Sequence, residues 1–242
     1  MSYKRKRDQG YWPDAYVSKR QVASRAIRRI KRGQRVFIGS SCGEPQALVR
    51  ELAAQFENFT DLEIVRILSL ETTPLTDIAD RTATQSFNIR SFYLGSAKPK
   101  ALSRNKRFIT PINLSAIPRL FKSRQLPIHV ALIQVSEPDD FGWMSLGVSV
   151  DVSIAAAQSA DMVIAQVNPR MPRVMGRSFI HVDEVDWIVE SALDAMREAG
   201  ATLVDVRLPG WLLEVKGDFY TTIRWREFRA QIPGYLATLG PG

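Results

Sequence analysis

The sequence contains few of the residues on which metal centres and disulfides depend. Its 242 residues include one cysteine, Cys42, and two histidines, His129 and His181. One cysteine cannot form an internal disulfide, and this set excludes a Cys/His zinc site. No apolar run approaches the ~18 residues of a membrane span, and no apolar signal segment follows the basic start. We therefore expect a soluble, cytoplasmic protein with no metal, no covalently bound cofactor and no membrane partner.

Positive charge is concentrated at one end of the chain. Residues 1–35 hold 12 lysines and arginines against Asp8 and Asp14, whereas the remaining residues hold 21 basic and 23 acidic side chains. A nucleic-acid-binding domain spreads its basic residues over a folded face. We therefore do not expect a nucleic-acid partner, although the cluster Lys4–Arg7 leaves a nucleic-acid-binding arm as an alternative.

Apolar runs alternate with helical patterns over the first 190 residues. The patterns predict strands at 35–38, 62–68, 88–94, 129–135 and 162–167, and helices at 17–31, 46–56, 116–121 and 151–160. This alternation predicts an α/β fold with a mostly parallel open sheet and helices on both faces. We expect a flexible basic arm at 1–15, the α/β domain at 16–190 and a short helix–strand–helix appendage at 191–242.

A glycine-bearing loop, Gly39-Ser-Ser-Cys-Gly43, lies between a predicted strand and a predicted helix. Backbone N–H groups and the helix dipole can hold an anion there, but a tight turn also requires glycine for its own geometry. Both interpretations stay open. Glu44 follows the loop and either is buried, lines a site or carries ordinary charge at a helix start. We expect Cys42 to be a buried, inert thiol, because neither histidine is placed to act as its base.

Two further loops follow predicted strands. The segment Asn168-Pro-Arg-Met-Pro-Arg173 begins where a strand ends, which is where open α/β sheets bind ligands. Its two prolines restrict the backbone that presents the asparagine and the arginines. It is either an anion site or a rigid loop with solvated arginines. The acidic segment 136–143 is typical of a turn rather than of a metal or acid–base site.

Several segments, taken in order, resemble one family. They are Gly43-Glu-Pro45, Val130–Asp140 with Phe141-Gly142, Ser145–Asp151, and Val167–Arg173 with Gly176 and Ser178–His181. From about residue 16 to residue 190 the chain resembles the N-terminal domain of the acetyl-CoA hydrolase/transferase family, which includes the 4-hydroxybutyrate and butyryl/acetate CoA-transferases.

This resemblance implies that the domain is one α/β half of a CoA-transferase or acetyl-CoA hydrolase. The implied substrates are an acyl-CoA and a short carboxylate, and coenzyme A moves between them through a glutamyl-CoA intermediate. In the family the nucleophilic glutamate belongs to a second half, which nothing in 191–242 resembles. We therefore assign no catalytic residue to this chain, and we expect it to be inactive alone.

The resemblance also implies a substrate-binding wall and a partner. The residues carried over as substrate-binding are Gly43, Glu44, Pro45, Asn168, Pro169, Met171, Pro172, Gly176 and His181. The expected protein partner is a second CoA-transferase half, which would complete the site, or another copy of this chain in a homo-oligomer. The alternatives are a non-catalytic module that binds CoA or a partner, and a nucleic-acid-associated protein that uses the basic arm.

Residues 192–242 have a weaker resemblance to a segment of the amidase-signature hydrolases. The Ser-Ser-Lys residues of that family are absent here. This predicts an appendage of different origin, and the alternative is an accidental likeness between common helix–strand–helix patterns.

Overall fold

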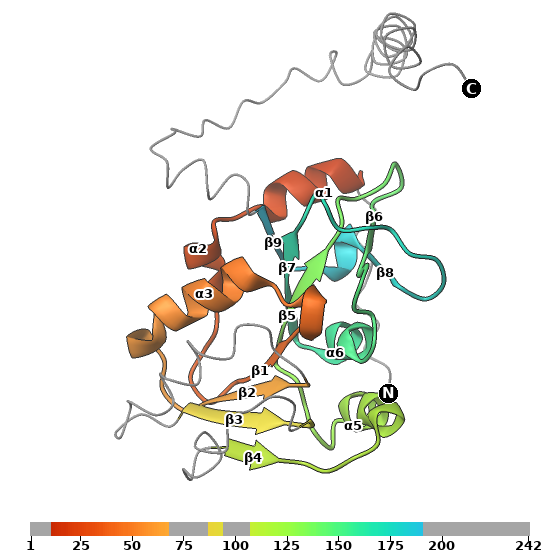
Figure 1. Ribbon diagram of the computed structural model, residues 1–242. Coiled ribbons are helices and arrows are strands. Elements are labelled where there is room, and N and C mark those ends of the chain that lie inside the picture. Colours follow the sequence, from red (N-terminus) through yellow and green to blue (C-terminus); the bar gives the residue numbers. More distant parts are fainter. Residues whose placement is uncertain (1–10, 68–86, 94–106, 191–242) are drawn as a thin grey trace, which may run out of the picture. The chain divides into compact units, whose positions relative to one another are not determined.

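The computed structural model describes residues 11–67, 87–93 and 107–190 (Figure 1). Its helices are α1 (Trp12–Lys19), α2 (Ala23–Ile27), α3 (Gln46–Ala54), α5 (Ile117–Lys122) and α6 (Ser153–Ser159). Its strands are β1 (Arg35–Ile38), β2 (Leu62–Arg66), β3 (Phe87–Ser91), β4 (Arg107–Ile109), β5 (Val130–Val135), β6 (Trp143–Ser145), β7 (Met162–Val167), β8 (Phe179–His181) and β9 (Trp187–Glu190). Short 3-10 turns lie at Ser41–Gly43, Phe56–Asn58, Leu114–Ala116 and Val182–Glu184.

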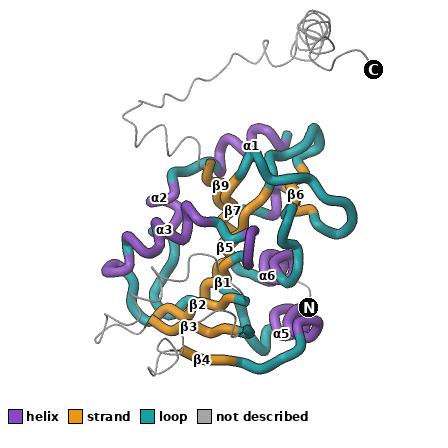
Figure 2. Tube along the Cα trace, in the orientation of Figure 1, coloured by secondary structure: helices purple, strands orange, loops and turns teal. Residues whose placement is uncertain are grey.

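Seven of these strands form one sheet in the order β4-β3-β2-β1-β5-β7-β9, and each neighbouring pair is parallel. Strands β6 and β8 form a separate antiparallel pair. Figure 2 shows α3 between β1 and β2, α5 between β4 and β5, and α6 between β6 and β7. The prediction of a mostly parallel open sheet with helices on both faces is confirmed.

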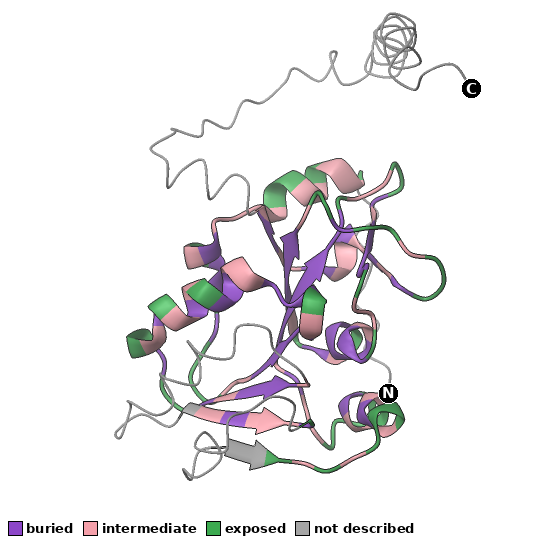
Figure 3. Ribbon diagram, in the orientation of Figure 1, coloured by how far each residue is buried: buried purple, intermediate pink, exposed green. Residues whose placement is uncertain are grey.

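The core lies on both faces of the sheet. In β1, Val36 and Ile38 pack with the buried residues of α2 and α3, whereas Phe37 packs with those of α5 and α6. Successive side chains of a strand point to opposite faces, so a strand covered on both sides must be apolar throughout. The central strands are accordingly buried along most of their length (Figure 3).

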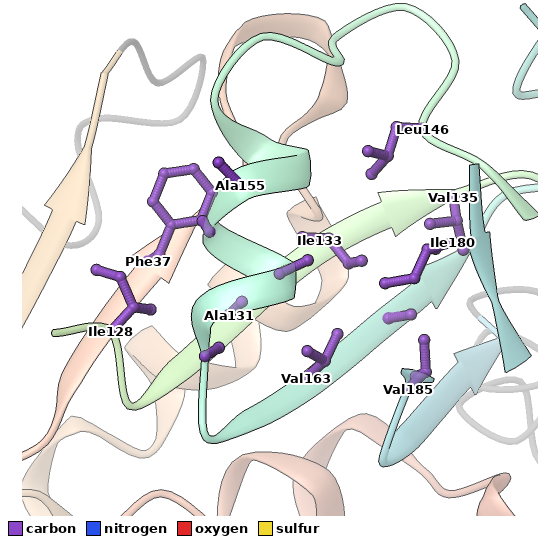
Figure 4. Packing of buried hydrophobic residues seen from close by; sticks show 14 of the residues in the cluster. Phe37, Ile128, Ala131, Ile133, Val135, Leu146, Ala155, Val163, Ile180 and Val185 are labelled. Atoms are coloured by element: carbon purple, nitrogen blue, oxygen red, sulfur yellow. The ribbon is translucent and has the colours of Figure 1, made fainter. Parts of the chain in front are cut away.

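Small side chains on α6 allow this helix to lie close to the sheet. Ala155 belongs to the same cluster as Phe37, Ala131 and Ile133, and Figure 4 shows these residues gathered between α6 and the strands. The ring of Phe37 also meets that of Phe121 on α5 edge-on, with centroids 5.8 Å apart. Fully burying a side chain of this size contributes roughly 1.5–3 kcal/mol to folding.

The N-terminal segment differs from the prediction of one helix over 17–31. Helix α1 begins at Trp12, inside the segment 1–15 assigned to a flexible arm, and it ends at Lys19. Arg20 then forms a parallel bridge with Ile188 of β9, and the backbone N–H of Gln21 donates to the Ile188 carbonyl at 2.8 Å. This pairing with the edge strand requires extended backbone, which separates α1 from α2.

The other predicted elements occur with small shifts of their ends, but four short strands were missed. The helix predicted at 46–56 ends at Ala54, and the helix predicted at 151–160 begins at Ser153. Strands β4, β6, β8 and β9 have three or four residues each, too few for a period-2 pattern. Residues 1–10 of the arm and the predicted appendage lie outside the described residues. No helix within 11–67, 87–93 and 107–190 is long and apolar enough to span a membrane.

Candidate functional site

The strand order changes direction between β1 and β5. From β1 the chain moves outward through β2, β3 and β4, and it then returns to β5 on the other side of β1 (Figure 1). Loops that follow β1 and β5 therefore leave in opposite directions, which is the arrangement at which open α/β sheets bind ligands. The loops at this edge are 39–45 after β1, 136–142 after β5 and 168–178 after β7.

Close packing explains both glycines of the β1–α3 loop. A Cβ at Gly39 would lie 2.9 Å from the carbonyl oxygen of Gly43, and a Cβ at Gly43 would lie 2.7 Å from the Cβ of Ser149. Both contacts are shorter than ordinary van der Waals separation. Glu44, the next residue, is 1% exposed. The loop is therefore a tight turn, as one interpretation held, and it places Glu44 inside the protein.

Cys42 lies in the same loop, in the short 3-10 turn, but its side chain is exposed. The prediction of a buried thiol is wrong. Gly39 and Gly43 face close neighbours, whereas the side chain of Cys42 is exposed.

Hydroxyl groups join the β1–α3 loop to the loop before α6. Ser40 donates to a carboxylate oxygen of Asp151, and its hydroxyl lies 3.1 Å from that of Ser149. The other carboxylate oxygen of Asp151 accepts from the backbone N–H of Ser153 at 2.8 Å. Asp151 thus accepts from the first residue of α6, whose N-cap residue is Val152, and anchors Ser40 as well.

Sequence reasoning missed Gln134 and Gln166. The Nε2 of Gln134 donates to the carbonyl of Glu44 at 2.9 Å, and its Oε1 accepts from Nδ2 of Asn168 at 2.8 Å. The Oε1 of Gln166 accepts from the backbone N–H of Ala47 at 2.9 Å. In the sequence, each glutamine is the one polar residue of an otherwise apolar strand, one position before its end.

The β7–β8 loop carries the second group of predicted site residues. Both side-chain functions of Asn168 are engaged, because its Oδ1 accepts from the backbone N–H of Arg170 at 2.9 Å. Met171 is buried against Gly147, where a Cβ would lie 2.2 Å from the Met171 sulfur. Pro169 and Pro172, next to these two residues, are exposed.

The structure places Arg173 in a structural role. Its guanidinium group lies 2.8 Å from a carboxylate oxygen of Asp139 and donates to the carbonyl of Trp143 at 3.0 Å. It also lies over the ring of Phe179, 5.1 Å from the centroid. Arg173 therefore joins two loops, which favours the rigid-loop interpretation, although Arg173 is exposed, as is Arg170.

The acidic segment 136–143 is a turn, as predicted. One carboxylate oxygen of Asp139 accepts from the backbone N–H groups of Phe141 and Trp143, at 3.0 and 2.9 Å. Within the described part of the chain, no group of three or more His, Cys, Asp or Glu residues could hold a metal ion.

Gly176 and His181 lie in other surroundings. Gly176 has a φ of +91°, so its glycine serves the backbone conformation of an exposed turn. The Nε2 of His181 lies 2.9 Å from the carbonyl of Phe141, and its Nδ1 accepts from the backbone N–H of Asp183 at 3.2 Å. Gln134 thus connects the segment Gly43–Pro45 to Asn168. His181 belongs to β8, which pairs with β6, and it contacts the loop that carries Phe141.

Tyr16 connects α1 to the carboxyl end of β9. Its hydroxyl donates to a carboxylate oxygen of Glu190 at 2.6 Å, and Arg20 lies 3.8 Å from the other oxygen. Burial, and then the hydrogen bond to Glu190, raise the pKa of Tyr16. This pair holds the last described residue of the sheet against the N-terminal helix.

Comparisons with curated proteins find relatives that transfer coenzyme A. The chain is 38% identical over 181 residues to the 4-hydroxybutyrate coenzyme A transferase of Clostridium kluyveri, with 75% of this chain and 42% of the relative covered. It is 28% identical over 192 residues to the butyryl-CoA:acetate CoA-transferase of Anaerostipes caccae, with 77% and 42% covered. The chain thus spans less than half the length of these relatives.

Solved structures and a family model agree with this result. The 4-hydroxybutyrate CoA-transferase of Porphyromonas gingivalis matches 74% of this chain and 41% of its own, with a TM-score of 0.61 and 25% identity. RipA of Yersinia pestis matches 83% and 46%, with a TM-score of 0.65 and 26% identity. The model of the acetyl-CoA hydrolase/transferase N-terminal domain matches residues 1–194. The chain therefore belongs to the acetyl-CoA hydrolase/transferase family, of which it carries the N-terminal domain.

Proposed function

We propose that this domain forms one wall of a site for an acyl-CoA thioester and a short carboxylate. The observation that carries the proposal is the tight β1–α3 loop at the point where the strand order reverses, with Glu44 buried directly after it. Relatives whose names state CoA transfer support the choice of ligand. In this proposal coenzyme A is a substrate rather than a resident cofactor.

The wall has an inner and an outer part. We place Gly43, Glu44 and Pro45 in the inner part with Asn168, because Gln134 bonds both to the Glu44 carbonyl and to the Asn168 side chain. The outer part is the rest of the predicted set: Pro169, Met171, Pro172, Gly176 and His181. Of these, Met171 is buried and Pro169, Pro172 and Gly176 are exposed, so we expect the exposed residues to contribute least to affinity.

The reaction implied by the family begins when a glutamate attacks the thioester carbonyl. An acyl-glutamyl anhydride forms and the CoA thiolate leaves; the thiolate then attacks the glutamyl carbonyl, giving glutamyl-CoA and releasing the carboxylate. We propose that this chain binds and orients CoA but supplies no nucleophile, so that a separate second half completes the site. The family model ends at residue 194, which supports the domain boundary we propose near residue 190.

Calorimetry with coenzyme A tests the binding wall. We expect the 242-residue chain to bind CoA, and we expect Glu44→Leu to weaken binding. Cys42→Ser is the matched control, since Cys42 is exposed in the same loop and its change should leave affinity unaltered. The absence of CoA binding by the folded wild-type chain would refute the proposed function.

An exchange assay tests the assignment of the nucleophile. The purified chain is incubated with acetyl-CoA and either acetate or 4-hydroxybutyrate, and CoA exchange is followed by chromatography. We expect none. Robust exchange by this chain alone would show that the nucleophile lies within these 242 residues.

A further inference from the structure

Two glutamines occupy matching positions on neighbouring strands. Gln134 of β5 and Gln166 of β7 are register partners, and they are 8% and 6% exposed. A buried amide costs free energy unless its donor and acceptor groups are hydrogen-bonded. Their hydrogen bonds therefore indicate what these two residues do at the carboxyl edge of the sheet.

Toward the segment around Pro45, one amide acts as a hydrogen-bond donor and the other as an acceptor. Gln134 donates to the carbonyl of Glu44 at 2.9 Å. Gln166 accepts from the backbone N–H groups of Ala47 and Leu48, at 2.9 and 3.4 Å. A carbonyl can only accept and a backbone N–H can only donate, so the backbone determines how each amide is turned.

Gln166 takes over the role of an N-cap for α3. The residue at the N-cap position is Pro45, and no side-chain cap bond is present there. The first N–H groups of a helix need acceptors from outside the helix, and Gln166 supplies one from the sheet. Gln134 reaches the other side of Pro45, so the two amides hold the turn before and after it.

We propose that Gln134 and Gln166 are positioning residues for the Glu44–Pro45 turn, one as a donor and one as an acceptor. Gln134 also accepts from Asn168, so it couples this turn to the β7–β8 loop. The proposal deepens the proposed function, because the turn it positions is the inner part of the CoA wall.

Because one amide donates and the other accepts, the same isosteric change to Glu is expected to disrupt one and to be tolerated at the other. In Gln166→Glu the acceptor remains, and its negative charge lies at the N-terminus of α3, where it is favourable. In Gln134→Glu a carboxylate oxygen replaces the donor and faces the Glu44 carbonyl, so two acceptors meet. Ordinary packing defects would not distinguish these variants, since the two side chains have the same size and similar burial.

The experiment measures amide hydrogen exchange and CoA affinity on the full 242-residue chain. We expect Gln134→Glu to speed exchange in 44–48 and in 168–171, and to weaken CoA binding about tenfold. We expect Gln166→Glu to keep exchange in 44–48 and CoA affinity within about twofold of wild type. Gln134→Met and Gln166→Met remove the hydrogen bonds without adding charge; the first should loosen both segments and the second only 47–48.

The outcomes show whether the positioning role or the proposed function fails. Equal responses to the two Glu variants would overturn the inference, as would altered exchange with unaltered affinity in a wild type that binds CoA. If the exchange asymmetry is present but wild type binds no CoA, positioning of the turn stands and the CoA function fails. If Gln134→Glu does not fold, Gln134→Met decides: unchanged exchange in 168–171 would overturn the coupling of the two loops.

Discussion

The separation between Gly43 and Ser149 makes the effect of one methyl group predictable. In Gly43→Ala the new Cβ would lie 2.7 Å from the Cβ of Ser149. An ordinary contact between carbon atoms needs about 3.5–4.0 Å, so one loop must move by roughly 1 Å. Neither Cβ can rotate away, because the backbone determines its position. Overpacking of this kind costs about 1–3 kcal/mol, and we expect a loss of this size in the free energy of unfolding.

A double-mutant cycle, with each variant's free energy of unfolding measured in urea, tests this clash directly. Ser149→Gly removes the opposing Cβ and should rescue Gly43→Ala, whereas Ser149→Ala keeps that Cβ and should not. Both Ser149 changes remove its hydroxyl, which lies 3.1 Å from that of Ser40, so the comparison isolates the methyl contact. The reasoning is refuted if Gly43→Ala is as stable as wild type, or if both Ser149 variants rescue it equally.

Two further predictions concern Tyr16 and Arg173. Burial and the bond to Glu190 raise the pKa of Tyr16 above its ordinary value of 10.0, so the folded state keeps this proton at a pH where the unfolded chain has lost it. Stability should therefore fall above pH 10.0 by up to about 1.4 kcal/mol per pH unit from this group. Tyr16→Phe should remove that part of the pH dependence in urea titrations, and Tyr11→Phe, an exposed control, should not. Arg173→Lys should cost about 1–2 kcal/mol in thermal unfolding, because lysine cannot reproduce the planar fork that joins Asp139 to Trp143. A loss of CoA affinity at unchanged stability would instead show that Arg173 binds the anion.

The long apolar strands could be predicted because their local pattern reflects complete burial. The strand predicted at 162–167 occurs with those ends, and the strand predicted at 129–135 begins one residue later. Strand β9 could not be predicted in this way. Its four residues become a strand by pairing with β7 on one side and with the segment at Arg20 on the other, and both partners are distant in sequence.

The candidate site was predicted in part for a similar reason. The family resemblance and the strand ends indicated both the Gly43–Pro45 segment and the loop beginning at Asn168. The local pattern could not show that Arg173 is engaged with Asp139 or that Cys42 faces outward. Side-chain direction in a loop depends on which other loop lies beside it, and that depends on the order of the strands.

By itself the sequence determined the alternation of strands and helices, the burial of the central strands and the family. These properties depend on local patterns and on the identity of short motifs. Only the tertiary structure decided that β5 lies beside β1, that Gln134 lies beside Gln166, and that both reach the segment around Pro45. The physical reason is that parallel strands pair across long crossovers, so the hydrogen bonds at their carboxyl ends join residues 34, 90 and 119 positions apart, which no local pattern records.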